Sequence, residues 1–254
     1  MADAPALDMR DVRFSYGDGA NAVDGVSLRI APGQSLGLVG ESGCGKSTVA
    51  RLACGLLRAR QGQVQVSGLE AGQRKGSSRL ALARAVQMVF QDPYGSLNPR
   101  QRIGAQLAEP LRLHGSDAAG PLTGQVREWL ERVGLPAAVA ERYPHELSGG
   151  QRQRVAIARA VAVQPYLLVC DEPVSALDVS VQAQILNLLR DLRETLGLAC
   201  LFISHDLRVV RYMAEEIAVM QQGRIVEMKG TDQLWEAAEH PYTRQLLASL
   251  PPDP

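Results

Sequence analysis

The sequence predicts an α/β fold in which a largely parallel sheet is joined by an amino-terminal antiparallel β-sheet and by an inserted group of helices. Three observations predict it. The short apolar run Leu36–Val39 leads into a glycine-rich loop, and the segment Thr48–Leu57 that follows looks helical. Strand-like and helix-like patterns alternate in the carboxyl-terminal half, which favours a parallel sheet. Apolar and polar residues alternate near the amino terminus, which is typical of half-buried antiparallel strands.

The amino-terminal sheet is predicted from two segments in which every second residue is apolar. The apolar positions are Val12, Phe14 and Tyr16 in the first segment and Val26, Leu28 and Ile30 in the second. Because successive side chains of a strand point to opposite faces, this spacing places the apolar side chains on one buried face. Residues 71–78 and 115–124 are predicted as flexible loops from their glycine and serine content.

An amphipathic helix is predicted in the middle of the chain. Apolar residues recur there at i, i+3, i+4 and i+7: Val126, Trp129, Leu130 and Val133. We expect this helix to belong to a helical insertion from Asp92 to Val163. The chain is thus predicted to be a single domain, 1–254, in which residues 1–91 and 164–254 form the β subdomain and the core, and residues 92–163 form the helical subdomain.

Two apolar runs in the carboxyl-terminal half, Leu167–Cys170 and Cys200–Ser204, are predicted to be buried strands. One face of the helix between them is marked by four apolar residues, Ile185, Leu188, Leu189 and Leu192. A hairpin is predicted further on, where Ile217–Met220 and Ile225–Glu227 flank the turn Gln221–Arg224.

The composition disfavours several classes of protein. The chain has 254 residues, with 27 basic and 27 acidic side chains, so its formal net charge of zero gives no electrostatic footprint for nucleic acid. Four widely spaced cysteines fit no zinc pattern and favour a reduced, cytosolic setting. Met1–Ala6 does not have the pattern of a signal peptide, and no apolar run reaches the roughly 18 residues that a membrane helix needs. A role at a membrane would therefore require docking on another protein.

The glycine-rich loop matches the phosphate-loop pattern GxxxxGK[ST], since Gly40–Ser47 reads GESGCGKS. Glycines allow the tight turn that lets backbone N–H groups surround phosphate oxygens, and Lys46 supplies a positive charge for the β and γ phosphates. The Ser47 hydroxyl is the hard oxygen ligand that a magnesium ion on those phosphates needs. The alternative is a glycine-rich surface turn. The residues predicted to bind nucleotide here are Gly40, Glu41, Ser42, Gly43, Cys44, Gly45, Lys46, Ser47 and Thr48.

Two carboxylates, Asp171 and Glu172, follow the apolar strand that begins at Leu167. Ligands gather at the carboxyl ends of strands in parallel α/β sheets, and two charges placed there need a cation or a chemical role. An acidic pair that merely ends a strand is the alternative, and the upstream phosphate loop makes it the weaker one. Cys170 is interpreted as an apolar strand residue.

A second string, Leu147–Gln151, reads LSGGQ. Together with the phosphate loop it resembles the ATP-binding cassette (ABC) family, and the resemblance covers essentially the whole chain. It implies a P-loop NTPase core of the RecA-like type and a magnesium-dependent ATPase that uses ATP and Mg²⁺. The resemblance also implies that two cassettes sandwich two nucleotides, so that the signature residues of one chain complete the ATP site of the opposite protomer. Those residues are Ser148, Gly149, Gly150 and Gln151.

The resemblance implies further roles for single residues. Asp171 resembles the aspartate that holds magnesium, Glu172 the glutamate that polarises the attacking water, and Asp178 the D-loop aspartate that couples the two sites. Gln91 resembles the Q-loop glutamine that contacts magnesium and the attacking water, where a lone glutamine would usually be a surface residue.

Two aromatic-ring residues complete the implied site. His205 resembles the switch histidine that reaches the γ-phosphate, although a single histidine is more often structural. Tyr16 lies where the family carries an aromatic ring that stacks on adenine, with a core or surface tyrosine as the alternative.

Two more strings narrow the resemblance. Phe90–Arg100 reads FQDPYGSLNPR and His240–Leu247 reads HPYTRQLL. Both resemble importer cassettes for oligopeptides, dipeptides and nickel or metal chelates, although the second could be an ordinary carboxyl-terminal helix. The chain is most similar to the second, compact cassette of such systems, and no iron–sulfur cluster is expected because it stops at Pro254.

This narrower resemblance implies an importer subunit on the cytoplasmic face of the inner membrane, peripheral to it. Its expected partners are two transmembrane permeases and a second ABC ATPase, with a heterodimer of cassettes favoured over a homodimer. An extracytoplasmic substrate-binding protein is an expected indirect partner. No nucleic acid is expected. The alternatives are a soluble subunit of a phosphonate-degrading complex and an ABC protein of translation or DNA repair.

Overall fold

The computed structural model describes residues 4–17, 19–72, 77–114 and 121–250, so the predicted loop residues 73–76 and 115–120 lie outside the described part. The described strands form two sheets, in the orders β2-β1-β4-β5 and β10-β9-β3-β8-β7-β6. The first sheet is antiparallel and contains β1 Leu7–Phe14, β2 Val23–Ile30, β4 Gln61–Val66 and β5 Leu69–Glu70. The second contains β3 Ser35–Val39, β6 Val86–Val89, β7 Leu167–Asp171, β8 Ala199–Ile203, β9 Glu216–Gln221 and β10 Arg224–Gly230. This second sheet is parallel except for the antiparallel pair β9–β10.

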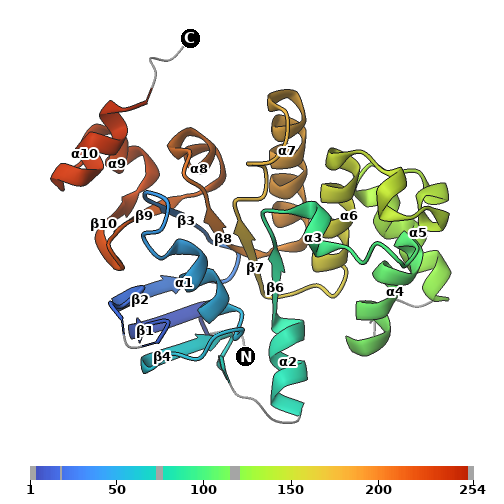
Figure 1. Cartoon of the computed structure of the whole chain (residues 1–254), viewed down its shortest axis with the longest axis horizontal. Coiled ribbons are helices and arrows are strands. Elements are labelled where there is room, and N and C mark those ends of the chain that lie inside the picture. Colours follow the sequence, from blue (N-terminus) through green and yellow to red (C-terminus); the bar gives the residue numbers. More distant parts are fainter. Residues whose placement is uncertain (1–3, 18, 73–76, 115–120, 251–254) are drawn as a thin grey trace.

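The helices lie around the second sheet (Figure 1). They are α1 Lys46–Ala53, α2 Ser77–Ala85, α3 Pro93–Ser96, α4 Ile103–His114, α5 Leu122–Arg132, α6 Gly149–Val161, α7 Val179–Leu196, α8 Leu207–Met213, α9 Thr231–Glu236 and α10 Pro241–Ala248, with 3₁₀ turns at Ala137–Glu141 and Pro144–Glu146. Helices α4, α5 and α6 pack on one another at the right of Figure 1, away from the antiparallel sheet. Among the described residues, none of these helices has both the length and the apolar character that a membrane crossing requires.

Both faces of the second sheet are buried at its central strands β3, β7 and β8. On β7, Leu167 and Val169 belong to a core shared with α1 and the antiparallel sheet, whereas Leu168 and Cys170 belong to a core shared with α4 to α8. A strand that is covered on both faces is apolar at every position, which is why it appears in the sequence as a continuous apolar run. The predicted α/β class with a largely parallel sheet is confirmed, and so is the inserted group of helices.

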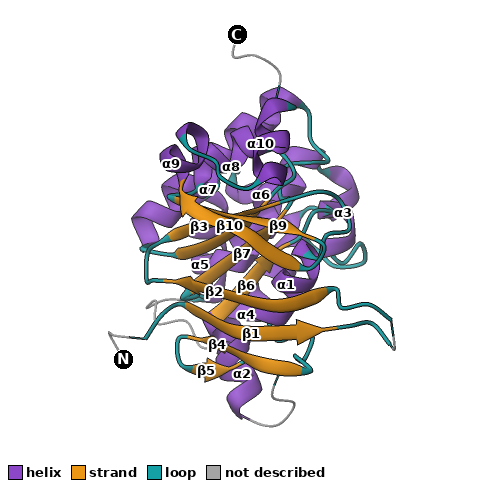
Figure 2. Cartoon of the chain, turned by 90° about the vertical axis from the view of Figure 1, so that its left-hand side faces the viewer, coloured by secondary structure: helices purple, strands orange, loops and turns teal. Residues whose placement is uncertain are grey.

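Helix α1 links the two sheets, since it contacts β4 of the first and β7 and β8 of the second. Figure 2 shows the antiparallel strands gathered at one end of the molecule, below the parallel strands and the helices behind them. This arrangement places the amino terminus of α1, which follows the phosphate loop, at the carboxyl edge of the parallel sheet. The division of the chain after residues 91 and 163 stays a prediction.

The first sheet follows the predicted alternation only in part. Val26, Leu28 and Ile30 of β2 are buried as expected. In the first segment, the prediction that Tyr16 lies on the buried face of the strand was wrong, because β1 ends at Phe14 and the Tyr16 side chain is 56% exposed. Asp11 has a φ of 44°, and the register of β1 shifts around it, so a strict period of two does not continue along the segment.

Several predicted boundaries were also wrong. Helix α1 ends at Ala53 instead of Leu57, because Gly55 adopts a φ of 65° and a left-handed glycine ends a helix. Helices α2 and α5 begin inside the two segments predicted as loops, at Ser77 and Leu122. The hairpin is confirmed, and its turn has positive φ at Gln222 and Gly223, as a two-residue turn between right-twisted strands requires.

The carboxyl-terminal helices are attached to β10 through Glu227, a carboxylate that is 9% exposed. Its two oxygens accept the backbone N–H groups of Glu239 and His240 at 2.8 and 3.0 Å. Burial on its own would raise the pKa of Glu227, but the nearby Thr243 hydroxyl, the hydrogen bonds from those two N–H groups and the Lys229 amine at 3.3 Å lower it to about 2. The ionised form is therefore the one that holds the turn before α10.

Glu227 is expected to make the free energy of unfolding depend on pH in the acidic range. Because its pKa falls from 4.5 to about 2 on folding, the stabilisation is complete above pH 4.5 and is lost as the pH falls towards 2. Replacing Glu227 with Gln should lower the free energy of unfolding by about 3 kcal/mol at pH 7, and by progressively less as the pH falls from 4.5 to about 2. Urea unfolding at several pH values measures this, with the exposed Glu236→Gln as a matched control. A difference between Glu227→Gln and the native chain that does not change with pH would contradict the assignment.

Candidate functional site

A cavity of about 490 Å³ opens at the carboxyl edge of the second sheet. The strands β6, β7, β8 and β3 are consecutive neighbours there, so the residues that follow them meet although they are far apart in the sequence. The lining residues are Tyr16, Ala22, Ser42, Gly43, Gly45, Lys46, Ser47, Thr48, Arg51, Gln91 and Glu172. Nine of these eleven were predicted as site residues from the sequence.

The phosphate loop packs closely against the backbone of two segments outside it, at Ala22 and at Met220. At Gly45 the φ is 114°, and a Cβ would lie 2.2 Å from the carbonyl oxygen of Ala22. At Gly40 a Cβ would lie 2.1 Å from the carbonyl oxygen of Met220 on β9. Neither position can hold a side chain without moving the neighbouring backbone, so glycine is required at both.

Lys46 begins α1 and is 5% exposed. Its ammonium group donates hydrogen bonds to the carbonyl oxygens of Gly40 at 2.7 Å and Glu41 at 2.8 Å. The charge is thus held across the loop that begins at Gly40, beside the N–H groups at the start of the helix. The Cys44 thiol lies 3.9 Å from the same amine, and burial raises the pKa of that thiol.

Two side chains with oxygen atoms suited to a hard cation, Ser47 and Asp171, lie next to each other at the end of the phosphate loop. The Ser47 hydroxyl donates to Asp171 Oδ1 at 3.2 Å, although the two residues are 124 positions apart. Burial raises the pKa of Asp171, the Ser47 hydrogen bond lowers it, and the neighbouring charge of Glu172 raises it further. A buried carboxylate beside a second carboxylate gains from a cation, and hydroxyl and carboxylate oxygens are the ligands that Mg²⁺ prefers. The donor set therefore fits the implied magnesium ion.

Glu172 is the point where three predicted residues come together. Its Oε2 atom accepts a hydrogen bond from Gln91 Nε2 at 3.3 Å and lies 3.3 Å from His205 Nδ1. Glu172 also has a φ of 48°, which is rare for a residue with a side chain, while its backbone N–H donates to the carbonyl oxygen of Ile203 on β8. The structure thus turns the Glu172 carboxylate towards the cavity that Gln91 also lines.

Tyr16, which follows β1 of the antiparallel sheet, also lines the cavity. Its hydroxyl is 3.3 Å from the Thr48 hydroxyl and accepts a hydrogen bond from Arg51 at 3.4 Å. Arg51 and Ala22 are the two lining residues that sequence reasoning missed. Arg51 could have been found, because it lies one helical turn after Ser47 on α1. Ala22 could not, because an alanine outside any motif gives no chemical signal in the sequence.

The signature residues lie elsewhere. Ser148 caps α6, accepting from the N–H of Gln151 at 3.3 Å, and the Gln151 side chain accepts from the N–H of Ser148 at 3.0 Å. At Gly150 a Cβ would lie 2.7 Å from the Val181 side chain. Within the described part of the chain, the lining of the cavity includes none of Ser148, Gly149, Gly150 or Gln151.

Helix α6 is nevertheless connected to the acidic pair. The Gln153 side chain, which is fully buried, donates to the carbonyl oxygen of Pro173 at 2.7 Å. Pro173 directly follows Glu172, so this hydrogen bond links the signature helix to the neighbour of a residue that lines the cavity. Asp178 lies further along the same loop, exposed, at the amino end of α7.

Comparison with known proteins matches the chain to the ABC transporter family model over residues 23–175. The oligopeptide transport ATP-binding protein OppF of Escherichia coli (strain K12) is 48% identical over 235 residues, which are 92% of this chain and 70% of that protein. The di/tripeptide transport ATP-binding protein DppF of Pseudomonas aeruginosa (strain UCBPP-PA14) is 49% identical over 236 residues, which are 92% of this chain and 73% of that protein.

A solved structure shows the same fold together with bound hydrolysis products. The dimeric, post-hydrolysis state of the ATP-binding cassette MJ0796, bound to ADP and Pi, has a TM-score of 0.78 and 27% identity, covering 89% of this chain and 98% of that one. Both the motifs and the fold of this chain are therefore those of an ATP-binding cassette. The chain belongs to the ABC transporter family and is one of its ATP-hydrolysing subunits.

Proposed function

We propose that this chain supplies the ATP-driven step of a peptide importer. One observation carries the proposal: Gln91 and His205 both contact the same oxygen of Glu172, beside a phosphate loop. OppF and DppF, two relatives at 48% and 49% identity, are named as ATP-binding proteins of oligopeptide and di/tripeptide transport. None of the relatives described here supports the phosphonate alternative.

The phosphate loop would bind the nucleotide through its backbone and Lys46. Residues of the glycine loop and of the first turn of α1 line the cavity, where a polyphosphate would gain from backbone N–H donors and from the positive end of the helix. Tyr16 would stack on the base, since its ring lines the cavity and is more than half exposed. Thr48 and Arg51, which contact the Tyr16 hydroxyl, would hold the ring in place.

Ser47, Asp171 and Gln91 would hold a magnesium ion. Bound there, the ion would neutralise phosphate charge that the protein's own cations leave uncompensated. The Ser47 hydroxyl and the Asp171 carboxylate already lie within hydrogen-bond distance, so little rearrangement of these side chains is required.

Glu172 would act as the general base that takes a proton from the attacking water. Gln91 and His205 would orient it, because both contact the same carboxylate oxygen. A base oriented in this way lowers the barrier to hydrolysis only for a water molecule that is placed correctly. Hydrolysis would therefore depend on all groups of the site being in position.

We propose that the site is completed by a second cassette. The signature residues are outside the lining of this chain's own cavity, while the MJ0796 structure is dimeric. Ser148, Gly149, Gly150 and Gln151 would then contact the nucleotide of the opposite protomer, with Asp178 coupling the two sites. The Gln153–Pro173 hydrogen bond would tie that contact to Glu172 within one chain. We expect the second cassette to be a different chain, as in the resemblance stated above.

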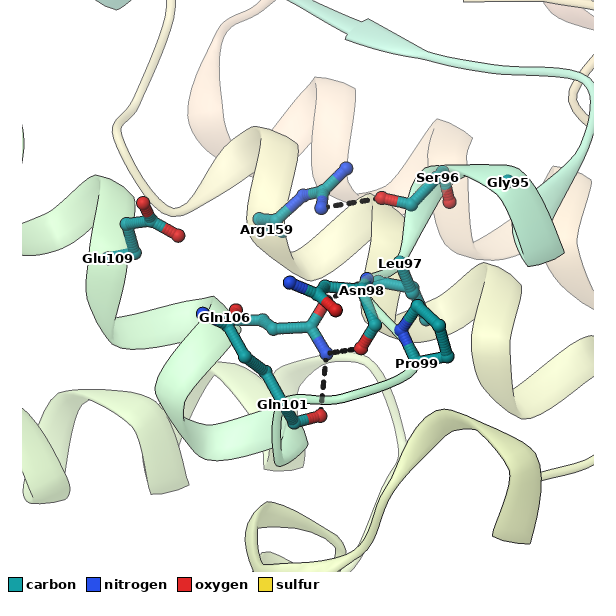
Figure 3. A pocket seen from close by; sticks show the side chains of 9 residues that line it. All are labelled: Gly95, Ser96, Leu97, Asn98, Pro99, Gln101, Gln106, Glu109 and Arg159. Carbon is teal, nitrogen blue, oxygen red and sulfur yellow. Dashed lines mark hydrogen bonds between the residues drawn. The ribbon is translucent and has the colours of Figure 1, made fainter.

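The permease contact is proposed for the segment from Gln91 to Arg100 and the helical subdomain, residues 92–163. A cavity of about 480 Å³ lies at this place. Its lining residues come from the loop and from α4 and α6 (Figure 3). Gln106, buried on α4, exchanges hydrogen bonds with both backbone groups of Asn98 and donates to the Gln101 carbonyl oxygen, so the loop has a fixed shape. Arg159 of α6 holds it from the other side through Ser96.

This docking would place the chain at the cytoplasmic face of the inner membrane as a peripheral subunit. Its partners would be two permeases and, indirectly, an extracytoplasmic substrate-binding protein. Peptides are the proposed cargo because the relatives carry that name, whereas nickel stays a prediction from the sequence.

Gentle detergent extraction of the tagged chain from its native membrane fraction tests the proposal. Mass spectrometry should identify two permeases and a second cassette, and the complex should hydrolyse ATP. Recovery with soluble enzyme subunits or nucleic acid alone would refute import while leaving the ATPase assignment intact. A Gln106→Ala variant, whose loop is no longer held, should retain ATP binding and lose the permeases.

A further inference from the structure

The carboxyl-terminal string HPYTRQLL places a tyrosine hydroxyl on the phosphate loop. The Tyr242 hydroxyl oxygen accepts a hydrogen bond from the backbone N–H of Glu41 at 2.9 Å, across 201 residues of sequence. Tyr242 is 5% exposed, and its ring packs in the core that contains Val219 and Leu234. Burial raises the pKa of this phenol above its ordinary value.

Other residues of the same string fix the position of this ring. His240 caps α10 by accepting the N–H of Tyr242 on its Nδ1 atom at 3.2 Å, and Pro241 occupies the first helical position. The Arg244 guanidinium donates to the carbonyl oxygens of Ala238 and Glu239 at 3.0 and 2.8 Å. These bonds, added to those of the Glu227 carboxylate, hold the turn before α10 from both sides.

Glu41 is thereby held at both of its backbone groups. Tyr242 accepts from its N–H, and Lys46 donates to its carbonyl oxygen at 2.8 Å. The peptide units of a phosphate loop must keep one orientation for their N–H groups to face an anion. The same fixed backbone positions the ammonium group of Lys46, which is also bonded to Gly40.

We propose that Tyr242 is a positioning residue for ATP binding, which makes the carboxyl-terminal helix a part of the nucleotide site. It acts through the backbone of Glu41 and not through contact with the nucleotide. This inference rests on the proposed role of the phosphate loop and extends it to a residue outside the family's nucleotide motifs. Removing the hydroxyl leaves the Glu41 N–H without this partner and allows the loop to sample orientations that bind phosphate less well.

The test is a Tyr242→Phe variant of the full chain, with ATP affinity measured by calorimetric titration. We expect the Kd for ATP to rise about five- to tenfold, where tenfold corresponds to about 1.4 kcal/mol. The KM for ATP should rise in the same proportion, with kcat at saturating ATP changed by less than about twofold, because bound ATP restores the loop. Hydrogen exchange should accelerate in the peptide that contains Glu41 and not in α7.

Tyr212→Phe is the matched control. The Tyr212 hydroxyl donates a hydrogen bond to Asn187, whereas the Tyr242 hydroxyl accepts one, and the Tyr212 bond joins α8 to α7. Neither Tyr212 nor Asn187 is among the described residues that line the cavity. The Tyr212→Phe variant should leave the ATP affinity unchanged, while its midpoint of thermal unfolding should shift by an amount similar to that of Tyr242→Phe. An unchanged Kd in Tyr242→Phe, or a loss of affinity equal to that of Tyr212→Phe, would overturn the role of Tyr242 alone. A native chain that binds no ATP would overturn the proposed function, and this inference with it.

Discussion

Replacing Glu172 with glutamine is expected to leave ATP binding within about twofold of the native value and to reduce turnover by about 10²- to 10⁴-fold. Glutamine keeps the shape of the side chain and its contacts with Gln91 and His205, but it cannot accept a proton from water. The loss corresponds to about 3 to 5 kcal/mol of transition-state stabilisation. Phosphate release measures turnover, and titration with ATP measures binding in the same preparation.

Glu194→Gln is the control for this substitution, since Glu194 lies near the end of α7 with a largely exposed side chain. It should hydrolyse ATP at the native rate. If Glu172→Gln did the same, Glu172 would not be the general base. The left-handed backbone at that residue would then need another explanation.

Replacing Lys46 with alanine is expected to weaken ATP binding by about 10²-fold, because charge-assisted hydrogen bonds are among the stronger polar interactions. Two effects add together. The phosphates lose a buried cation, and the carbonyl oxygens of Gly40 and Glu41 lose the amine that holds them. The loss in Lys46→Ala should therefore exceed that in Tyr242→Phe, which affects the loop but keeps the charge. Titration with ATP at a fixed salt concentration measures the difference.

Arg29→Ala removes a positive charge from an exposed position on β2 and provides the matched control. It should change the Kd for ATP by less than about twofold, because an exposed charge outside the cavity is screened by solvent. Equal affinities for Lys46→Ala and Arg29→Ala would show that the ammonium group of Lys46 does not serve the phosphates.

Local patterns in the sequence predicted the α/β class and most of the cavity lining. The phosphate loop, the strand ending at Asp171 and the hairpin at Gln222 each depend on residues that are adjacent along the chain. Backbone conformation and strand burial follow from such local patterns because glycine, β-branched and apolar residues limit what a short segment can adopt. Tyr16 marks the limit of that reasoning, since the bulge at Asp11 interrupts the alternation that the sequence implies.

The sequence by itself determined the class of fold, the nucleotide motifs and the resemblance to ATP-binding cassettes. Only the tertiary structure decided which distant groups meet: Tyr242 with Glu41, Gln153 with Pro173, and Gln91 and His205 on one oxygen of Glu172. A hydrogen bond between residues 201 positions apart leaves no periodic signal in the chain, because it depends on how the strands are ordered in the sheet and not on neighbouring residues. For the same reason, the sequence shows the string HPYTRQLL but does not predict the hydrogen bond between its Tyr242 and the phosphate loop.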